Sequence, residues 1–169
     1  MIRTVGSELI EEGSEHAGSA PVDLDALFRA EGDGVYRTLY AFTGGRVDVA
    51  EDATAEAFAR AVARREGLHD PVAWIYRVAF RVAIDELRRD RRRSELKEAP
   101  IDPPELLGVM DGLRRLSPNQ RAAIVLRHVM DLDVTEVARR MGIATPTVRV
   151  HLHRGRVRLR ELLGTEEVD

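Results

Sequence analysis

The stretch from residue 133 to residue 163 decides the fold: DVTEVARRMGIATPTVRVHLHRGRVRLRELL. It opens with Asp133, whose carboxylate suits the free N–H groups at a helix start, and apolar residues follow at helical spacing. Gly142 can adopt the positive φ that ends a helix, and Thr145-Pro146 combines a capping residue with a first-turn proline. The pattern therefore predicts a short helix, a tight turn and a longer helix capped by Thr145.

The longer of these helices has two unlike sides. Apolar or small residues recur on one side at spacings of three and four: Val148, Leu152, Gly155, Leu159 and Leu162. A short helix that braces a longer basic one is the arrangement of a helix-turn-helix, whose second helix enters the DNA major groove. An ordinary helical hairpin is the alternative. The polar side carries Thr147, Arg149, His151, His153, Arg154, Arg156, Arg158 and Arg160.

The net charge of −3 is distributed unevenly along the 169 residues. Residues 1–56 hold 4 Arg against 12 Asp and Glu, whereas residues 77–97 hold 8 Lys and Arg against 4 acids. Residues 139–160 hold 7 Arg and no acid. Two separated basic segments on an otherwise acidic chain fit two contacts with a polyanion, although solvated arginine-rich helices would have the same composition.

Helical patterns cover most of the chain and strand signals are weak, so the predicted fold class is all-α. We expect two small helical domains joined by a short linker that contains Pro100, Pro103 and Pro104. A first helix is expected within residues 22–42, with a break near Gly32-Asp33-Gly34. The expected parts are a flexible tail at 1–21, a first domain at 22–93, the linker at 94–104, a helix-turn-helix domain at 105–163 and a C-terminal tail at 164–169.

Three further helix starts carry capping signals. Asp48 stands three residues before Glu51, which allows a reciprocal cap. Asp70-Pro71 is a cap followed by a first-turn proline, and residues 117–120, Ser-Pro-Asn-Gln, combine a capping box with proline. Helices are expected from about 49 to 65, 71 to 92, 105 to 116 and 118 to 130.

Several classes of function have no support in the sequence. The chain has no cysteine, which excludes disulfides, thiolate zinc sites and iron–sulfur clusters, and fits a cytoplasmic location. No uncharged apolar run approaches the ~18 residues of a membrane span. His151 and His153 point apart on a helix, and no phosphate loop or nucleophile motif is present. We therefore expect no enzyme activity, no metal and no cofactor.

Four stretches of the chain, in order, resemble the extracytoplasmic-function (ECF) sigma factors of bacterial RNA polymerase. Residues 50–61, AEDATAEAFARA, resemble the family's A-E-D-x-x-Q-E-x-F-x-x-A helix, and residues 71–89 resemble its W-L-Y-R-I-A-x-N-x-x-x-D-x-x-R helix. Residues 116–127, LSPNQRAAIVLR, resemble L-P-x-x-x-R-x-x-x-x-L-R, and residues 135–160 resemble the family's helix-turn-helix. The resemblance covers about residues 22–163.

This resemblance implies a sigma factor that binds core RNA polymerase and directs promoter-specific initiation by recognising −10 and −35 promoter elements. It also implies an anti-sigma factor as a partner. Polymerase contacts would fall on Asp52, Glu56 and Arg60, and contacts with the −10 element on Arg77, Phe80, Arg81, Arg88 and Arg89. Contacts with the −35 element would fall on Thr147, Arg149, Val150, His151, His153, Arg154, Arg156 and Arg158.

The chain departs from the family pattern at several positions. The loop of residues 66–70 is short and has no aromatic residue, and Phe80-Arg81 replaces the family's x-Asn pair. Arg149-Val150-His151 stands where Lys/Arg-Ser-Arg is common, so the promoter preference does not carry over. Trp74, on an apolar stripe, is expected in the core rather than on DNA. A stand-alone helix-turn-helix regulator and a sigma-like protein that only sequesters a partner are the alternatives.

Overall fold

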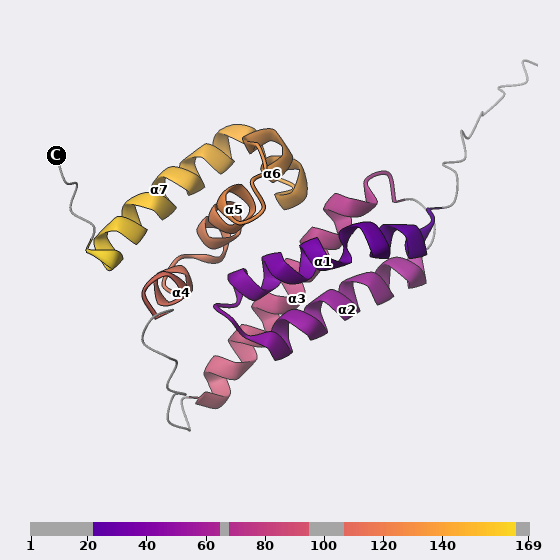
Figure 1. Ribbon diagram of the computed structural model, residues 1–169, viewed down its shortest axis with the longest axis horizontal. Helices are drawn as coiled ribbons and strands as arrows, with labels where there is room; N and C mark the ends of the chain where they lie inside the picture. Colours follow the sequence, from indigo (N-terminus) through magenta and orange to yellow (C-terminus); the bar gives the residue numbers. More distant parts are fainter. Residues whose placement is uncertain (1–21, 65–67, 95–106, 165–169) are drawn as a thin grey trace, which may run out of the picture.

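The computed structural model describes residues 22–64, 68–94 and 107–164 (Figure 1). These ranges form α-helices joined by short turns, in agreement with the predicted all-α class. The predicted tail at 1–21, nearly all of the linker and most of the C-terminal tail lie outside the described residues. The helices are α1 Leu24–Phe42, α2 Val47–Arg64, α3 Pro71–Ser94, α4 Leu107–Arg114, α5 Pro118–His128, α6 Val134–Met141 and α7 Thr145–Leu163.

Helices α1, α2 and α3 pack together as the first unit (Figure 1). Its interior is built from small and medium apolar side chains, among them Val35, Ala53 and Ile75, which are fully buried. The predicted break near Gly32 is wrong, because α1 runs without interruption from Leu24 to Phe42. Gly32 instead gives room to the Phe28 ring, which would lie 3.3 Å from an added Cβ and which packs edge-on against Phe58.

Helices α4 to α7 form the second unit, in which α7 packs against α4, α5 and α6. Ser117 caps α5 and exchanges hydrogen bonds with Gln120, so the predicted capping box is present. This start signal lies next to residues that α5 buries completely, including Val125 and Leu126. The capping residues and the apolar residues that follow them both indicate a helix that starts at this point. A helix start can be predicted from sequence when two such signals coincide.

Two other predicted caps are wrong. Asp48 lies inside the first turn of α2, where its carboxylate accepts from Arg46 Nε at 2.9 Å instead of capping the helix. The residue that precedes α7 is Ala144, which offers no side-chain cap, and Thr145 is already helical. Asp70 does cap α3 as predicted, because its Oδ1 accepts from the N–H of Ala73 at 3.1 Å.

The two units pack directly against each other and share one continuous apolar core. Helix α6 lies on α3, and α4 and α5 lie on α1 (Figure 1). Phe42 at the end of α1 and Leu116 before α5 are both buried in this shared core. The expectation of two helical units is therefore met, but in the structure these units are closed on one another.

Candidate nucleic-acid interface

The turn between α6 and α7 has the geometry of a helix-turn-helix. Asp133 Oδ1 accepts from the N–H groups of Thr135 and Glu136, both at 2.8 Å, and so fixes the start of α6. Gly142 ends α6 in the left-handed region, with φ 68°, which side chains other than glycine rarely adopt. The N–H of Ile143 then donates to Ala138 O at 3.1 Å, which fixes the turn before α7 begins.

Helix α7 buries one side and leaves the other open. Val148, Leu152 and Gly155 are buried, as predicted from their spacing. In the described part of the chain, Arg149, Arg154 and Arg156 have no ion pair or hydrogen bond, whereas Arg158 pairs with Glu161 at 3.0 Å. Of the residues predicted to contact the −35 element, His151 is half-buried, and the exposed ones are Thr147, Arg149, Val150, His153, Arg154, Arg156 and Arg158.

The residues predicted to contact the −10 element lie along α3, and the second unit approaches them closely. Phe80 is only 7 % exposed and packs edge-on against Phe42, with ring centroids 4.9 Å apart. Arg77 is half-buried and donates through Nη1 to the Arg139 carbonyl of α6 at 3.3 Å. Arg81 and Arg88 are exposed but line a groove whose far wall includes Pro118 and Asn119 of α5, and exposed Arg89 pairs with Glu86 at 3.0 Å.

The aromatic residues of α3 belong largely to the core. Tyr76 is 1 % exposed and lies 6.4 Å from the Phe80 ring, in agreement with packing between residues four apart. Trp74 is half-buried against the core, as expected, and the Arg64 guanidinium lies 5.9 Å from its ring centroid. These rings are therefore not open stacking platforms in this arrangement of the units.

The residues predicted to contact polymerase lie together on the exposed side of α2. Asp52, Glu56 and Arg60 are all exposed, and Glu56 accepts from Arg60 Nε at 2.7 Å. They line a shallow groove together with Asp85, Glu86 and Arg89 of α3. The residues that line this groove all come from α2 and α3, and Asp85 also lines the groove between α3 and α5.

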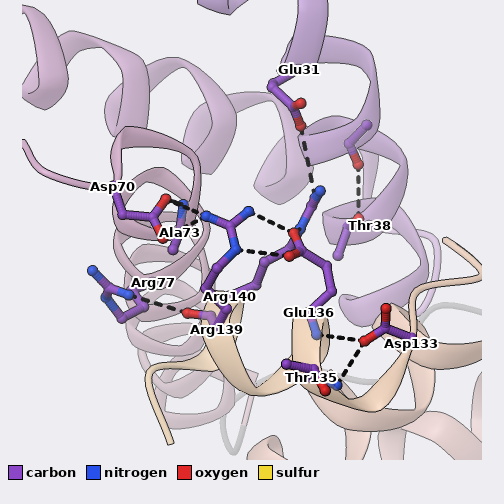
Figure 2. A network of polar contacts seen from close by, with 11 residues as sticks. Glu31, Thr38, Asp70, Ala73, Arg77, Asp133, Thr135, Glu136, Arg139 and Arg140 are labelled. Atoms are coloured by element: carbon purple, nitrogen blue, oxygen red, sulfur yellow. Dashed lines mark hydrogen bonds and ion pairs between the residues drawn. The ribbon is translucent and has the colours of Figure 1, made fainter.

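Sequence reasoning missed a polar cluster between α6 and the first unit (Figure 2). Arg139 Nη1 lies 2.5 Å from the Asp70 carboxylate, and Arg140 Nη1 lies 3.7 Å from Glu31. The Arg140 guanidinium also lies 4.4 Å from the ring centroid of Tyr76. Asp70 was recognisable only as a cap and the two arginines only as part of a basic segment, because no local pattern links residues so far apart.

Charge pairing in this cluster lowers the pKa of two carboxyl groups, those of Glu136 and Asp70. The hydrogen bond from Arg139 is the largest cause that lowers the pKa of Glu136 to about 2, with Arg140 also contributing. Burial alone would raise the pKa of Asp70, but the Arg139 hydrogen bond, the Ala73 N–H and the nearby positive charges outweigh it and lower that pKa. Both acids are therefore held ionised at neutral pH.

Residues 22–64, 68–94 and 107–164 offer neither a cluster of metal ligands nor a membrane-spanning helix. Within these ranges there is no group of three or more His, Asp or Glu side chains that could hold a metal ion. None of the helices there is long and apolar enough to cross a membrane.

A helical unit joined to a helix-turn-helix with an open basic face defines a two-part DNA-binding protein. Residues 27–93 match the family described as Sigma-70 region 2, and residues 106–159 match Sigma-70, region 4. The chain is 32% identical to the ECF RNA polymerase sigma factor SigE of Mycolicibacterium smegmatis, over 94% of this chain and 72% of that protein. It is 30% identical to the RNA polymerase sigma-E factor of Streptomyces antibioticus, over 88% of each.

Two solved structures have the same fold. The sigma factor RpoE of Bartonella quintana, in complex with the anti-sigma factor NepR, matches with a TM-score of 0.66 at 21% identity, over 86% of this chain and 99% of that one. CnrH, in complex with the cytosolic domain of CnrY, matches with a TM-score of 0.64 at 24% identity, over 85% and 89%. The chain belongs to the ECF sigma factors of the sigma-70 family, a non-enzymatic family that directs RNA polymerase to promoters.

Proposed function

We propose that α7 reads the −35 promoter element through Arg149, Val150, His151, His153 and Arg154. Thr147, Arg156 and Arg158 would contact the phosphates on either side. The observation that supports this assignment is the open basic face of α7, where Arg149 and Arg154 have no partner in the described part of the chain. Arginines in this state can donate two parallel hydrogen bonds to guanine or bind phosphate without first breaking an ion pair.

For the −10 element we propose the face of α3 that carries Arg77, Phe80, Arg81, Arg88 and Arg89. Arg81 and Arg88 are exposed and without a carboxylate partner in the described residues, which suits a DNA strand. Phe80 is buried while the units are closed, so it could stack on an unpaired base only after the units separate.

The acidic groove on α2 and α3 would dock on core RNA polymerase through Asp52, Glu56 and Arg60. Exposed acids suit a basic protein surface and repel DNA, which separates this contact from the two DNA contacts. We place the protein in the cytoplasm, where it would also meet an anti-sigma factor. The domain boundaries that we propose are residues 22–93 and 105–163, with a linker at 94–104.

Run-off transcription with purified core polymerase on a pool of genomic promoter fragments tests this function. Start sites that appear only when the chain is added are the expected result. Specific binding of duplex DNA by the chain alone, with no new start sites, would instead indicate a stand-alone regulator. Arg149→Ala should reduce the specific starts, and Arg160→Ala, an exposed arginine on the same helix outside the proposed set, serves as the matched control.

A further inference from the structure

Helix α6 covers the part of α3 that the proposed function assigns to the −10 element. The Arg77 guanidinium is engaged by the Arg139 carbonyl, and an added Cβ at Gly142 would lie 2.7 Å from Arg77 Cδ. The backbone at the end of α6 therefore lies directly against a side chain that DNA would need. DNA and α6 cannot occupy this part of α3 at the same time.

Ion pairs lie beside the apolar contacts between α6 and the first unit. Asp70 and Glu31 face Arg139 and Arg140, respectively, across the two units (Figure 2). Glu136, on α6 itself, lies 2.6 Å from Arg139 Nη2 and 2.7 Å from Arg140 Nε. Because Glu136 holds both arginines from its own helix, they are already oriented toward the first unit.

A second group of arginines holds the other end of the contact. The last turn of α1 contains no basic residue of its own, although carbonyl groups are left free there. Arg121 of α5 donates to Phe42 O at 3.1 Å, and Arg114 of α4 donates to Gly44 O at 2.5 Å. The second unit thus supplies the cations that the end of α1 lacks.

The two ends of the contact differ in how easily they can open. Arg121 is 4 % exposed, so its hydrogen bonds are shielded from water and salt. The side chains of Asp70 and Arg139 are 34% and 42% exposed, and ion pairs of this kind are weak and screened by salt. The Asp70–Arg139 pair is therefore the point at which the closed arrangement can be released, although Arg140 beside it is only 9 % exposed.

We infer that the ion pairs Asp70–Arg139 and Glu31–Arg140 hold α6 on α3 as an autoinhibitory contact that blocks the −10 surface of the free chain. Asp70 and Glu31 pair with the arginines that Glu136 holds from α6, and α6 covers Arg77 and Tyr76. This inference rests on the proposed function only for the identity of the blocked ligand. The closed contact itself can be tested without DNA or polymerase.

The natural absence of cysteine allows two spin labels to be placed, at Ala59→Cys on α2 and Val157→Cys on α7, both exposed. Distances between the labels are measured by pulsed electron paramagnetic resonance spectroscopy. The test variant is Asp70→Asn with Glu31→Gln, in which Asn retains the cap on α3 while both charges are lost. The matched control is Asp33→Asn with Asp111→Asn, which removes two carboxylates from ion pairs within single helices.

The labelled parent and the control should each give one narrow distance, and the test variant should add a broad population at longer distance. The test variant should also bind a single-stranded −10 oligonucleotide about threefold to tenfold more tightly than the control, the scale expected from losing the partly exposed Asp70–Arg139 pair and the longer Glu31–Arg140 pair. Identical distance distributions in the test variant and the control would overturn the inference. A shift in distance without tighter binding would overturn the autoinhibitory role, and run-off transcription by the parent chain tests the proposed function separately.

Discussion

The two basic faces of this sigma factor look alike in sequence and differ in the structure. Both lie on arginine-rich helices, but α7 presents Arg149 and Arg154 to solvent, whereas α3 has Arg77 and Phe80 against the second unit. The difference shows that the density of charge along a helix does not determine which charges a ligand can reach. The availability of each face is therefore set by the tertiary contact.

The largest expected effect is on the covered side, at Arg121. This buried guanidinium donates to Phe42 O, Arg114 O and Leu116 O, and lies 5.2 Å from the Phe42 ring centroid. Arg121→Met should lower the free energy of unfolding by about 2 to 4 kcal/mol, because buried carbonyls lose their donors. Urea denaturation measures the free energy of unfolding. As a control, Arg115→Ala, at an exposed position, should change this free energy by less than ~0.5 kcal/mol.

A loss below about 1 kcal/mol for Arg121→Met would mean that these carbonyls find other donors. Burial, together with the charges of Arg91 and Arg114, also lowers the pKa of Arg121 to about 10. Because this pKa is still well above 7, the side chain is charged at neutral pH. Its loss therefore removes a buried cation together with its hydrogen bonds.

On the open side, Arg149→Ala and Arg154→Ala should each weaken binding of a −35 duplex by ~1–3 kcal/mol if the arginine contacts a base edge. Neither should alter the urea midpoint, because neither side chain has a partner in the described part of the chain. Fluorescence anisotropy at two salt concentrations measures the affinity. If both variants bound as tightly as the parent chain, α7 would not be the reading helix.

Substitutions at two glycines distinguish the cost of backbone strain from the cost of disturbing the contact between the units. Gly142 and Gly164 both end helices with φ near +65°, at 68° and 63°, but among the described residues only Gly142 has a close neighbour, Arg77. Gly164→Ala should cost about 1 kcal/mol through strain alone. Gly142→Ala should cost more and should also add a population at longer distance between the two spin labels, since Arg77 must move.

Equal costs for the two glycine variants, with no change in distance, would mean that Arg77 moves aside freely. The closed contact would then not depend on close packing at the end of α6.

The smallest expected effect is on pH dependence. Because the folded chain lowers the pKa of Glu136 from 4.5 to about 2, its contribution to stability is complete above pH 4.5 and is lost as the pH falls toward 2. Glu136→Gln should therefore be less stable than the parent chain at pH 7, with a difference that shrinks on acidification. Urea denaturation across this range checks it, with Glu161→Gln as the control. A difference that stays constant with pH would contradict the assignment.

Local signals predicted the elements of this fold well. The capping box at Ser117, the cap at Asp70 and the turn at Gly142 combine short-range chemistry with apolar periodicity, and all three are present. The break predicted at Gly32 failed because a glycine within a helix can serve close packing as well as a turn. Asp48 failed as a cap because Arg46, two residues away, binds its carboxylate.

The closed contact was not predictable from sequence. Its ion pairs join residues as far apart as Asp70 and Arg139, and each partner fits another explanation, a cap or a solvated basic face. The exposed side of α7 could be predicted, because the amphipathic spacing of its apolar residues indicates which side of the helix is buried. The exposure of α3 depends instead on what packs over it, and periodicity within one helix carries no such information.

The most direct test of the contrast between the two faces joins the units covalently where they now pair. The variant Asp70→Cys with Arg139→Cys, treated with a short bis-maleimide crosslinker, replaces the ion pair by a bond in a chain with no other cysteine. The crosslinked chain should bind the −35 duplex as tightly as the uncrosslinked variant, yet give no specific run-off transcripts with core polymerase. Transcripts at the level of the uncrosslinked variant would contradict the account, because initiation would then proceed with α3 still covered.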